Sequence, residues 1–285
     1  MDRFSKFHPI VSFSFFMFAI ILTVSFANPI YYSVSLVASF FYLLKLKEKE
    51  VFETLFKFII PLIIFVGVFN MIFCHYGDTV LFAVKEIKFT LECLCYGFSN
   101  GLMLSAVILW FSAYNEVITS DKFMALFGKI SPNLALLFCM ILRFIPLMEK
   151  TSKEIKDAQI GVGKETKGLK NTISRFSSLI SISLEKSIET ADSMKARGFG
   201  ITKRSHYSRY CFKVNDALLL VSFTVLFVFL IVFKSLGYFD FSFNPVIEVV
   251  KFDCFSLVIS VLLFFIPLIL DLLEDVKWLY LKSKI

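Results

Sequence analysis

The sequence predicts an all-α integral membrane protein with about six transmembrane helices and a helical module on the cytoplasmic side. Two observations lead to this fold class. Hydrophobic residues make up 57% of the chain, with 37 Phe and only 11 Gly, and they are gathered in long runs instead of being spread as in a soluble domain. One long polar and basic stretch, 114–215, interrupts these runs.

Six apolar runs of roughly 16–21 residues carry almost no charge and are close to the length that crosses a membrane. They cover 8–27, 29–44, 55–73, 93–113, 216–233 and 255–270. A cleaved signal peptide is the alternative for the first run, but no small-residue cleavage site follows it. We therefore expect an N-terminal membrane block, 1–113, with about four spans. A C-terminal block, 216–285, follows with about two spans and a basic tail.

The placement of Lys and Arg predicts the orientation of the chain. The stretch 114–215 holds 17 Lys and Arg against nine Asp and Glu, although the whole chain carries a net charge of only +7. Cytoplasmic loops of membrane proteins are rich in Lys and Arg. We therefore expect both termini and 114–215 in the cytoplasm. The charge indicates topology and attraction to anionic lipid, and no nucleic-acid binding is expected.

Residues for catalysis or for metal binding do not gather in the sequence. The six Cys are scattered, mostly in apolar runs where Cys behaves as a small hydrophobe. Gly161-Val162-Gly163-Lys164 lacks the rest of a phosphate-binding loop. No two of the three histidines are spaced to share a site: His8, His75 and His206. The sequence thus predicts no catalytic residue, no metal and no cofactor, and no ATP hydrolysis by this chain.

The cytoplasmic module begins with a short amphipathic piece, 122–130, and Pro132 then starts a first long helix. The apolar part of this helix, 134–148, is too short for a firm transmembrane assignment. A seventh span is the alternative, but it would place the basic module or the basic tail outside. We expect a helix buried at the inner face, kinked by Pro146, which continues into polar residues up to 160.

A second long helix is predicted from the apolar residues between Ile173 and Met194, which recur with a period near 3.6. Asn171 or Thr172 can cap its start, and Gly198 fits the position after its end.

Both long helices end in a glycine-containing tip, at 161–163 and at 196–198. At the second tip the Arg197 guanidinium can form a two-pronged hydrogen bond with a carboxylate of another protein. Met194 and Phe199 offer an apolar surface beside it. The alternative is that Arg197 is one more positive residue on the inner side of the membrane.

Three motifs carry a family resemblance. Arg143-Phe144-Ile145-Pro146-Leu147 is followed by Ala158-Gln159 and then by Met194-Lys195-Ala196-Arg197-Gly198-Phe199. This order resembles the transmembrane coupling (T) component of energy-coupling factor transporters, the EcfT/CbiQ-like family. His8-Pro9 and Asn28-Pro29 extend the resemblance over nearly the whole chain.

The resemblance implies a non-catalytic, multi-pass subunit in the plasma membrane of a prokaryote. It implies three partners: two ABC-type ATPase subunits, whose grooves receive two coupling helices that each end in Ala-Arg-Gly, and a small membrane subunit that binds the substrate. The transported substrate stays open between a vitamin and a metal ion.

The family motif carries over fully at one tip and partly at the other. Ala196, Arg197 and Gly198 match the second Ala-Arg-Gly. The first reads Gly161-Val162-Gly163, so its glycine is present and valine replaces the arginine. We expect asymmetric docking, with a charged contact at Arg197 and a largely apolar contact at 158–163.

Other residues of the motifs are expected to support the coupling helices. They are Arg143, Pro146, Ala158, Gln159, Met194 and Phe199. Arg143 could brace its helix against Glu149, Asp157 or Glu92, or it could extend toward lipid phosphate.

The predicted function is transmission of ATP-driven motion from two ATPases to a substrate-binding membrane subunit, for uptake of a micronutrient. One alternative is a permease subunit of an ordinary ABC transporter, which would use a single short coupling loop. A lipid-processing enzyme is another, and it should show clustered His or acidic residues at one membrane level. The last is a membrane scaffold whose basic module binds anionic lipid.

Overall fold

The computed structural model of the chain describes residues 4–47, 50–74, 79–84, 87–128, 131–163, 168–201, 210–237, 241–243, 248–249 and 254–282. The chain forms two compact units. The membrane unit comprises Met1–Lys122 and Tyr210–Ile285, and the helical insert comprises Phe123–Arg209. The domain division expected from topology, after 113 and before 216, stays a prediction.

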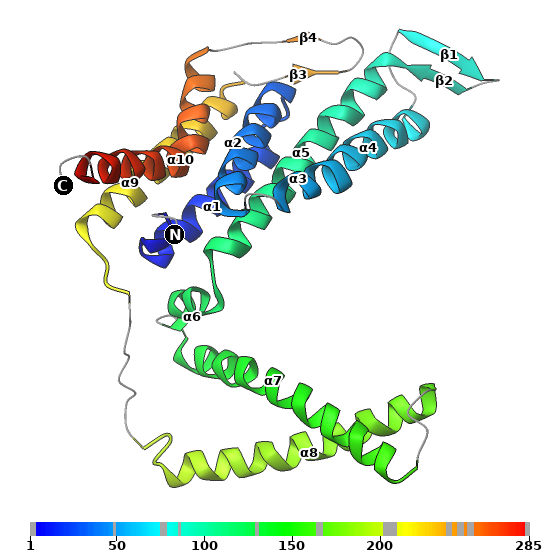
Figure 1. Cartoon of the computed structure of the whole chain (residues 1–285). Helices are drawn as coiled ribbons and strands as arrows, with labels where there is room; N and C mark the ends of the chain where they lie inside the picture. Colours follow the sequence, from blue (N-terminus) through cyan, green and yellow to red (C-terminus); the bar gives the residue numbers. More distant parts are fainter. Residues whose placement is uncertain are drawn as a thin grey trace. The chain divides into compact units, whose positions relative to one another are not determined.

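The membrane unit is built from helices, most of them apolar, that follow one another along the chain (Figure 1). They are η1 (Phe4–Lys6), α1 (Pro9–Ser25), α2 (Pro29–Lys47), α3 (Glu50–Thr54), η2 (Leu55–Ile59), α4 (Ile60–Phe73), α5 (Leu91–Val117), α9 (Val214–Ser235) and α10 (Cys254–Lys282). In the described part of the chain, β1 (Val80–Val84) pairs antiparallel with β2 (Ile87–Thr90), and β3 (Phe241–Ser242) pairs antiparallel with β4 (Glu248–Val249).

Among the residues that the structure describes, five helices are long and apolar enough to cross a membrane, judged by length and composition: Pro29–Lys47, Val51–Phe73, Leu91–Val117, Val214–Ser235 and Cys254–Trp278. The apolar helix α1 is shorter, at 17 residues, which corresponds to about 26 Å. These helices confirm the predicted fold class of an all-α membrane protein.

The second candidate span contains a widened turn. Its helix passes from α3 through η2, a π-helical turn, into α4, and the N–H of Ile60 donates to the carbonyl of Leu55. Pro61 has no N–H, and its ring would clash with the carbonyl of Lys57 in a regular α-helix. The wider turn just before Pro61 accommodates this clash.

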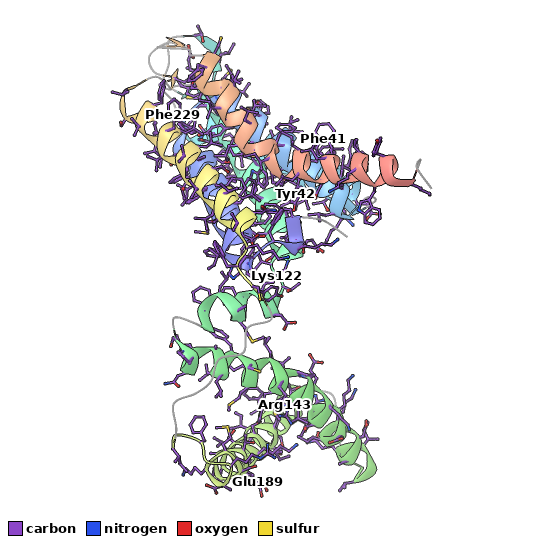
Figure 2. The ribbon with its side chains drawn as sticks, turned by 90° about the vertical axis from the view of Figure 1, so that its left-hand side faces the viewer. Phe41, Tyr42, Lys122, Arg143, Glu189 and Phe229 are labelled. Atoms are coloured by element: carbon purple, nitrogen blue, oxygen red, sulfur yellow. The ribbon has the colours of Figure 1, made fainter. Side chains whose placement is uncertain are left out.

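The core of the membrane unit is aromatic and centres on Trp110 of α5, which is fully buried. Its ring lies 5.7 Å from that of Phe15 and 6.1 Å from that of Phe264, measured between centroids. Tyr42 of α2, labelled in Figure 2, completes the cluster at 6.5 Å. Burial of such large apolar rings holds α1, α2, α5 and α10 together.

A buried hydrogen-bond chain runs through the same core. The indole N–H of Trp110 donates to Ser35 Oγ at 2.9 Å, and Ser35 Oγ lies 2.7 Å from Thr23 Oγ1. Thr23 in turn donates to the carbonyl of Ala19 at 2.8 Å. Because an unpaired polar group is costly in an apolar interior, this chain fixes the register of α1, α2 and α5.

Helices α4 and α5 approach closely at three glycines. A Cβ atom on Gly97 would lie 2.7 Å from Asn70 Cβ and 2.9 Å from Gly67 Cα. A Cβ atom on Gly101 would lie 3.0 Å from Ile63 Cα. Gly97 and Gly101 form a Gly-x-x-x-Gly pair, the pattern that lets membrane helices pack backbone against backbone. This motif is readable in the sequence, although we did not predict a helix contact from it.

The helical insert consists of most of α6 (Ser120–Gly128), then α7 (Pro132–Gly161) and α8 (Leu169–Ala196). Phe123 of α6 lies 6.1 Å from Phe138 of α7, nearly edge-on at 87°. Helices α7 and α8 contact each other and cross, as Figure 1 shows. At 30 and 28 residues, they are about 45 Å and 42 Å long.

Replacement of Gly97 by Ala tests the close packing of α4 on α5. The added methyl group would overlap Asn70 and the Gly67 backbone, at a cost of about 1–3 kcal/mol for overpacking. This exceeds the gain in helix propensity of about 1 kcal/mol, so the Tm of the detergent-solubilised protein should fall. Gly161→Ala is the matched control, because its methyl group would meet no atom within 4 Å. Equal Tm values for the two variants would contradict the close approach.

Candidate protein-docking site

The first tip is the C-terminal end of α7. The helix ends at Gly161, and Val162 caps it with φ −90° and ψ 5°. Val162 N–H donates to the Ala158 carbonyl at 3.2 Å, and Gly163 N–H donates to the Ile160 carbonyl at 2.9 Å. Gly163 has φ 75°, in the left-handed region that favours glycine. The Val162 side chain is 76% exposed, so an apolar group stands at the apex of this tip.

The second tip is the C-terminal end of α8. Arg197 caps this helix with φ −83° and ψ 7°, and Gly198 follows with φ 83°. Gly198 N–H donates to the Lys195 carbonyl at 2.9 Å, and Phe199 N–H donates to the Met194 carbonyl at 3.1 Å. This pair of hydrogen bonds defines a Schellman motif, which usually brings an apolar contact between the residues at the Met194 and Phe199 positions.

The two tips have the same backbone conformation at the cap residue and at the glycine that follows it. Val162 and Arg197 occupy the cap positions with φ and ψ that agree within ten degrees. Gly163 and Gly198 both follow with positive φ. The cap N–H of each donates four residues back at 3.2 Å, to Ala158 and to Ser193 respectively. The backbone therefore presents valine in one tip where it presents arginine in the other.

Arg197 is exposed, and in the described part of the chain it forms no ion pair. The nearby acid Asp192 lies 3.9 Å from Lys195 instead. A guanidinium at a helix end, with no ion-pair partner among the described residues, can donate two parallel hydrogen bonds to a carboxylate of another molecule.

Within the insert, the apolar side chains of 134–148 on α7 are exposed, with Leu134 at 52% and Ile141 at 44%. The expected burial of this segment at the inner face of the membrane stays a prediction. Among the described residues of α7 only Thr151 is buried. The helix continues through Pro146, and it is not among the helices that meet the length and hydropathy of a span.

Arg143 lies along α7 (Figure 2) and is exposed. Within the described part of the insert it forms no ion pair with Glu149 or Asp157, so the structure gives no support for bracing by these acids. Ala158 is also exposed, whereas Gln159 is half-buried. The Gln159 side-chain oxygen has no hydrogen-bond partner among the described residues, and it lies three residues before the cap.

Helix α8 presents its whole apolar stripe to the outside of the insert. No described residue of α8 is buried. The stripe consists of Ile173, Phe176, Ile180, Leu184 and Ile188, which are 45–67% exposed. An apolar stripe of this length is typical of a surface that a partner or a membrane covers. The periodicity that the sequence predicted is thus present, but this chain does not bury it in the insert.

The start of α8 differs from the expected one. The helix begins at Leu169, and its N-cap is Gly168 with φ 105°. Asn171 and Thr172, which we expected as caps, lie in the first turn, where Thr172 Oγ1 donates to the Gly168 carbonyl at 3.1 Å. The contact between the two long helices includes Ser183 of α8, whose hydroxyl lies 2.8 Å from the sulfur of Met148.

Among the described residues no group of three or more His, Cys, Asp or Glu side chains could hold a metal ion. Two acids of the spans that we did not predict as site residues are nevertheless buried, Asp216 at 4% and Asp271 at 2% exposure. The sequence could have indicated both residues, because an acidic residue within an apolar helix is rare unless it has a defined role.

One family model matches the chain, that of CbiQ, described as a cobalt transport protein, over residues 5–207. The match covers well over half of the 285 residues and includes both tips, so the predicted resemblance is confirmed. No curated protein matches the chain. The chain belongs to the CbiQ family of cobalt transport proteins, and it is therefore a multi-pass membrane component of a micronutrient transporter.

Proposed function

We propose that this chain is the coupling subunit of an energy-coupling factor importer. In this function the insert docks two ABC-type ATPase subunits through its two tips. The membrane unit binds a small membrane subunit that carries the substrate. The chain itself is non-catalytic, and it lies in a prokaryotic plasma membrane with both termini and the insert in the cytoplasm.

The observation that carries this proposal is the matching cap geometry of the two tips at the ends of two long helices. A duplicated, rigid helix end suits two related partners, because the same backbone shape can enter the same kind of groove twice. An ordinary permease with one coupling loop would not need the duplication.

Long helices are suited to transmitting movement. When the ATPases close on ATP, the grooves that hold the tips would move with them. Helices α7 and α8 contact each other and can transfer this displacement as rigid bodies. The exposed apolar stripe of α8 offers a surface that neighbouring subunits of the complex can contact while α8 moves.

The docking is asymmetric. Arg197 supplies a charged fork at the second tip, whereas the exposed Val162 supplies only apolar contact at the first. Lys164, which lies outside the described residues, could supply a charged contact at the first tip. This contact would be weaker than that of an arginine, because an ammonium does not form the planar fork. Anionic lipid is proposed as a further partner of the basic insert.

The substrate is not proposed to bind to this chain. The family's description names cobalt, and a cobalt ion would in this proposal be the cargo of the substrate-binding subunit. A vitamin is the alternative cargo.

Arg197→Glu should remove the charged contact at the second tip and strongly lower the amount of partner ATPase that co-purifies with this chain. The chain is co-expressed with candidate ABC ATPases and isolated in detergent, and the ATPase bound per chain is measured. Arg197→Ala should weaken binding by about 30-fold, because interface arginines often contribute about 2 kcal/mol or more. The matched control is Arg175→Ala on the same helix, 22 positions earlier and thus about 33 Å away.

The outcomes separate the candidate functions. Retention of ATPase by the wild type and by Arg175→Ala, with loss in Arg197→Glu, supports docking at the second tip. Equal retention in all variants would show that Arg197 is not the anchor. No ATPase with the wild type would favour a membrane scaffold that binds anionic lipid.

Val162→Arg should strengthen ATPase binding at the first tip by about three- to tenfold, the range expected for one new charge-assisted contact. The gain should shrink at high salt because the added contact is electrostatic. Leu169→Arg is the control, since it adds the same charge to a side chain that is 85% exposed and lies outside the tip. An equal gain in both variants, or none in either, would contradict asymmetric docking.

A further inference from the structure

The chain passes between the membrane unit and the helical insert at two points. It leaves the membrane unit after Lys122 and returns to it at Tyr210. We call the residues next to these points, 117–122 and 210–216, the outgoing and the returning root. Both roots belong to the membrane unit, and both are fastened to the same N-terminal segment, residues 4–8.

The outgoing root is held by a buried lysine. Lys122, labelled in Figure 2, is only 6% exposed. Its ammonium donates to the Ser5 carbonyl at 2.6 Å and to the Ser5 hydroxyl at 2.7 Å. A third hydrogen bond, to the Val117 carbonyl at 2.7 Å, joins it to the end of α5. A lysine is rarely buried so deeply unless its charge is satisfied in this way.

The returning root is held by a buried aspartate. Asp216 accepts a hydrogen bond from the N–H of Lys213 at 2.9 Å, which caps the start of α9. Its other oxygen accepts a longer hydrogen bond, 3.4 Å, from the N–H of His8. The His8 ring also packs edge-on against Phe212, with centroids 5.2 Å apart.

The N-terminal segment is itself fixed in the bundle. Phe4 is fully buried and packs against Phe15 and Tyr42, with centroids 5.3 Å and 6.3 Å apart. Its N–H donates to Asp271 of α10 at 3.3 Å, and its carbonyl accepts from Ser12 of α1 at 3.2 Å. Residues 4–8 therefore contact α1, α2 and α10 as well as both roots.

We infer that residues 4–8 act as a clasp that makes the two roots move together, and that Lys122 is a positioning residue for energy coupling. This inference rests on the proposed function. Any pull that the insert exerts through the backbone reaches the spans at the two roots. While residues 4–8 contact both roots, displacement of either root also displaces α1, α2 and α10. If these contacts are broken, each root can move alone, and movement of the insert no longer reaches these helices.

The chemistry of the clasp favours a role in positioning over a role in stability alone. Hydrogen bonds to a buried charge fix the distance and the orientation between the two segments that they join. An apolar side chain of similar volume can pack without fixing this geometry. Lys122 contacts a segment 117 residues earlier in the chain, so the bond joins parts of the fold that local structure does not already hold together.

The test measures the distance between the roots in nanodiscs that hold this chain with its ATPases. Nitroxide labels are placed at Ser120→Cys and at the native Cys211, both exposed positions, after replacement of the other five cysteines. Lys122→Met removes the ammonium and keeps the stem, and Lys122→Arg restores a buried cation with several donors. Lys153→Met on the surface of α7 is the matched control.

The wild type and Lys153→Met should give a narrow distance distribution that shifts on addition of ATP. Lys122→Met should give a broadened distribution and lose the ATP-dependent shift, while it retains ATPase at the wild-type level. Lys122→Arg should recover part of the narrow distribution. If Lys122→Met does not fold, Ser5→Ala, which removes one of three acceptors, should broaden the distribution to a smaller degree.

A Lys122→Met protein with the wild-type distribution and the wild-type shift would overturn the clasp while leaving the proposed function intact. Failure of the wild type to retain ATPase would overturn the proposed function instead. The width of the distribution, measured on this chain alone, would then still decide whether Lys122 holds the roots together.

Discussion

The constraint on which this structure depends is that a polar group in an apolar interior must find its partner within the protein. Inside the membrane unit this constraint joins helices that are far apart in sequence. Trp110 donates to Ser35, and Lys122 donates to Ser5. The positions of these partners, together with the rings packed around Trp110, determine how the spans can sit against one another.

At the ends of the two long helices of the insert, backbone polar groups also find partners within the protein, but these partners are close in sequence. In the last turn of both α7 and α8, backbone carbonyls accept hydrogen bonds from the N–H groups of the cap residue and of a glycine with positive φ. No side chain is needed for this closure, so the cap residue is free to point outward. The fold thereby presents Val162 and Arg197 at equivalent places, and the proposed asymmetry of docking depends on this difference alone.

Much of this architecture could be predicted from the sequence. The spans follow from apolar run length, and the two long helices follow from periodicity and from the glycines at their ends. The start of α8 was predicted wrongly, because Asn171 and Thr172 are good cap residues by type while Gly168 caps the helix by conformation. The Gly97-x-x-x-Gly101 pattern is present in the sequence, but the helix contact that it indicates was not predicted.

Contacts between distant residues could not be predicted in the same way. Nothing near Lys122 in the sequence indicates Ser5 as its partner, and nothing near Phe4 indicates Asp271. The exposure of 134–148 could not be predicted either, since an apolar run has the same pattern whether its own chain, a lipid or a partner covers it. At the first tip, the sequence already showed valine in place of arginine, and the structure adds that Val162 occupies the cap position.

Site-specific photo-crosslinking in cells tests the central claim most directly. A photoreactive amino acid is placed at position 162, at position 197 or, as a control, at position 169, in the chain expressed with its native partners. The account predicts ATPase adducts from both tips and none from position 169. Adducts with lipid alone, or no adduct from either tip, would contradict it.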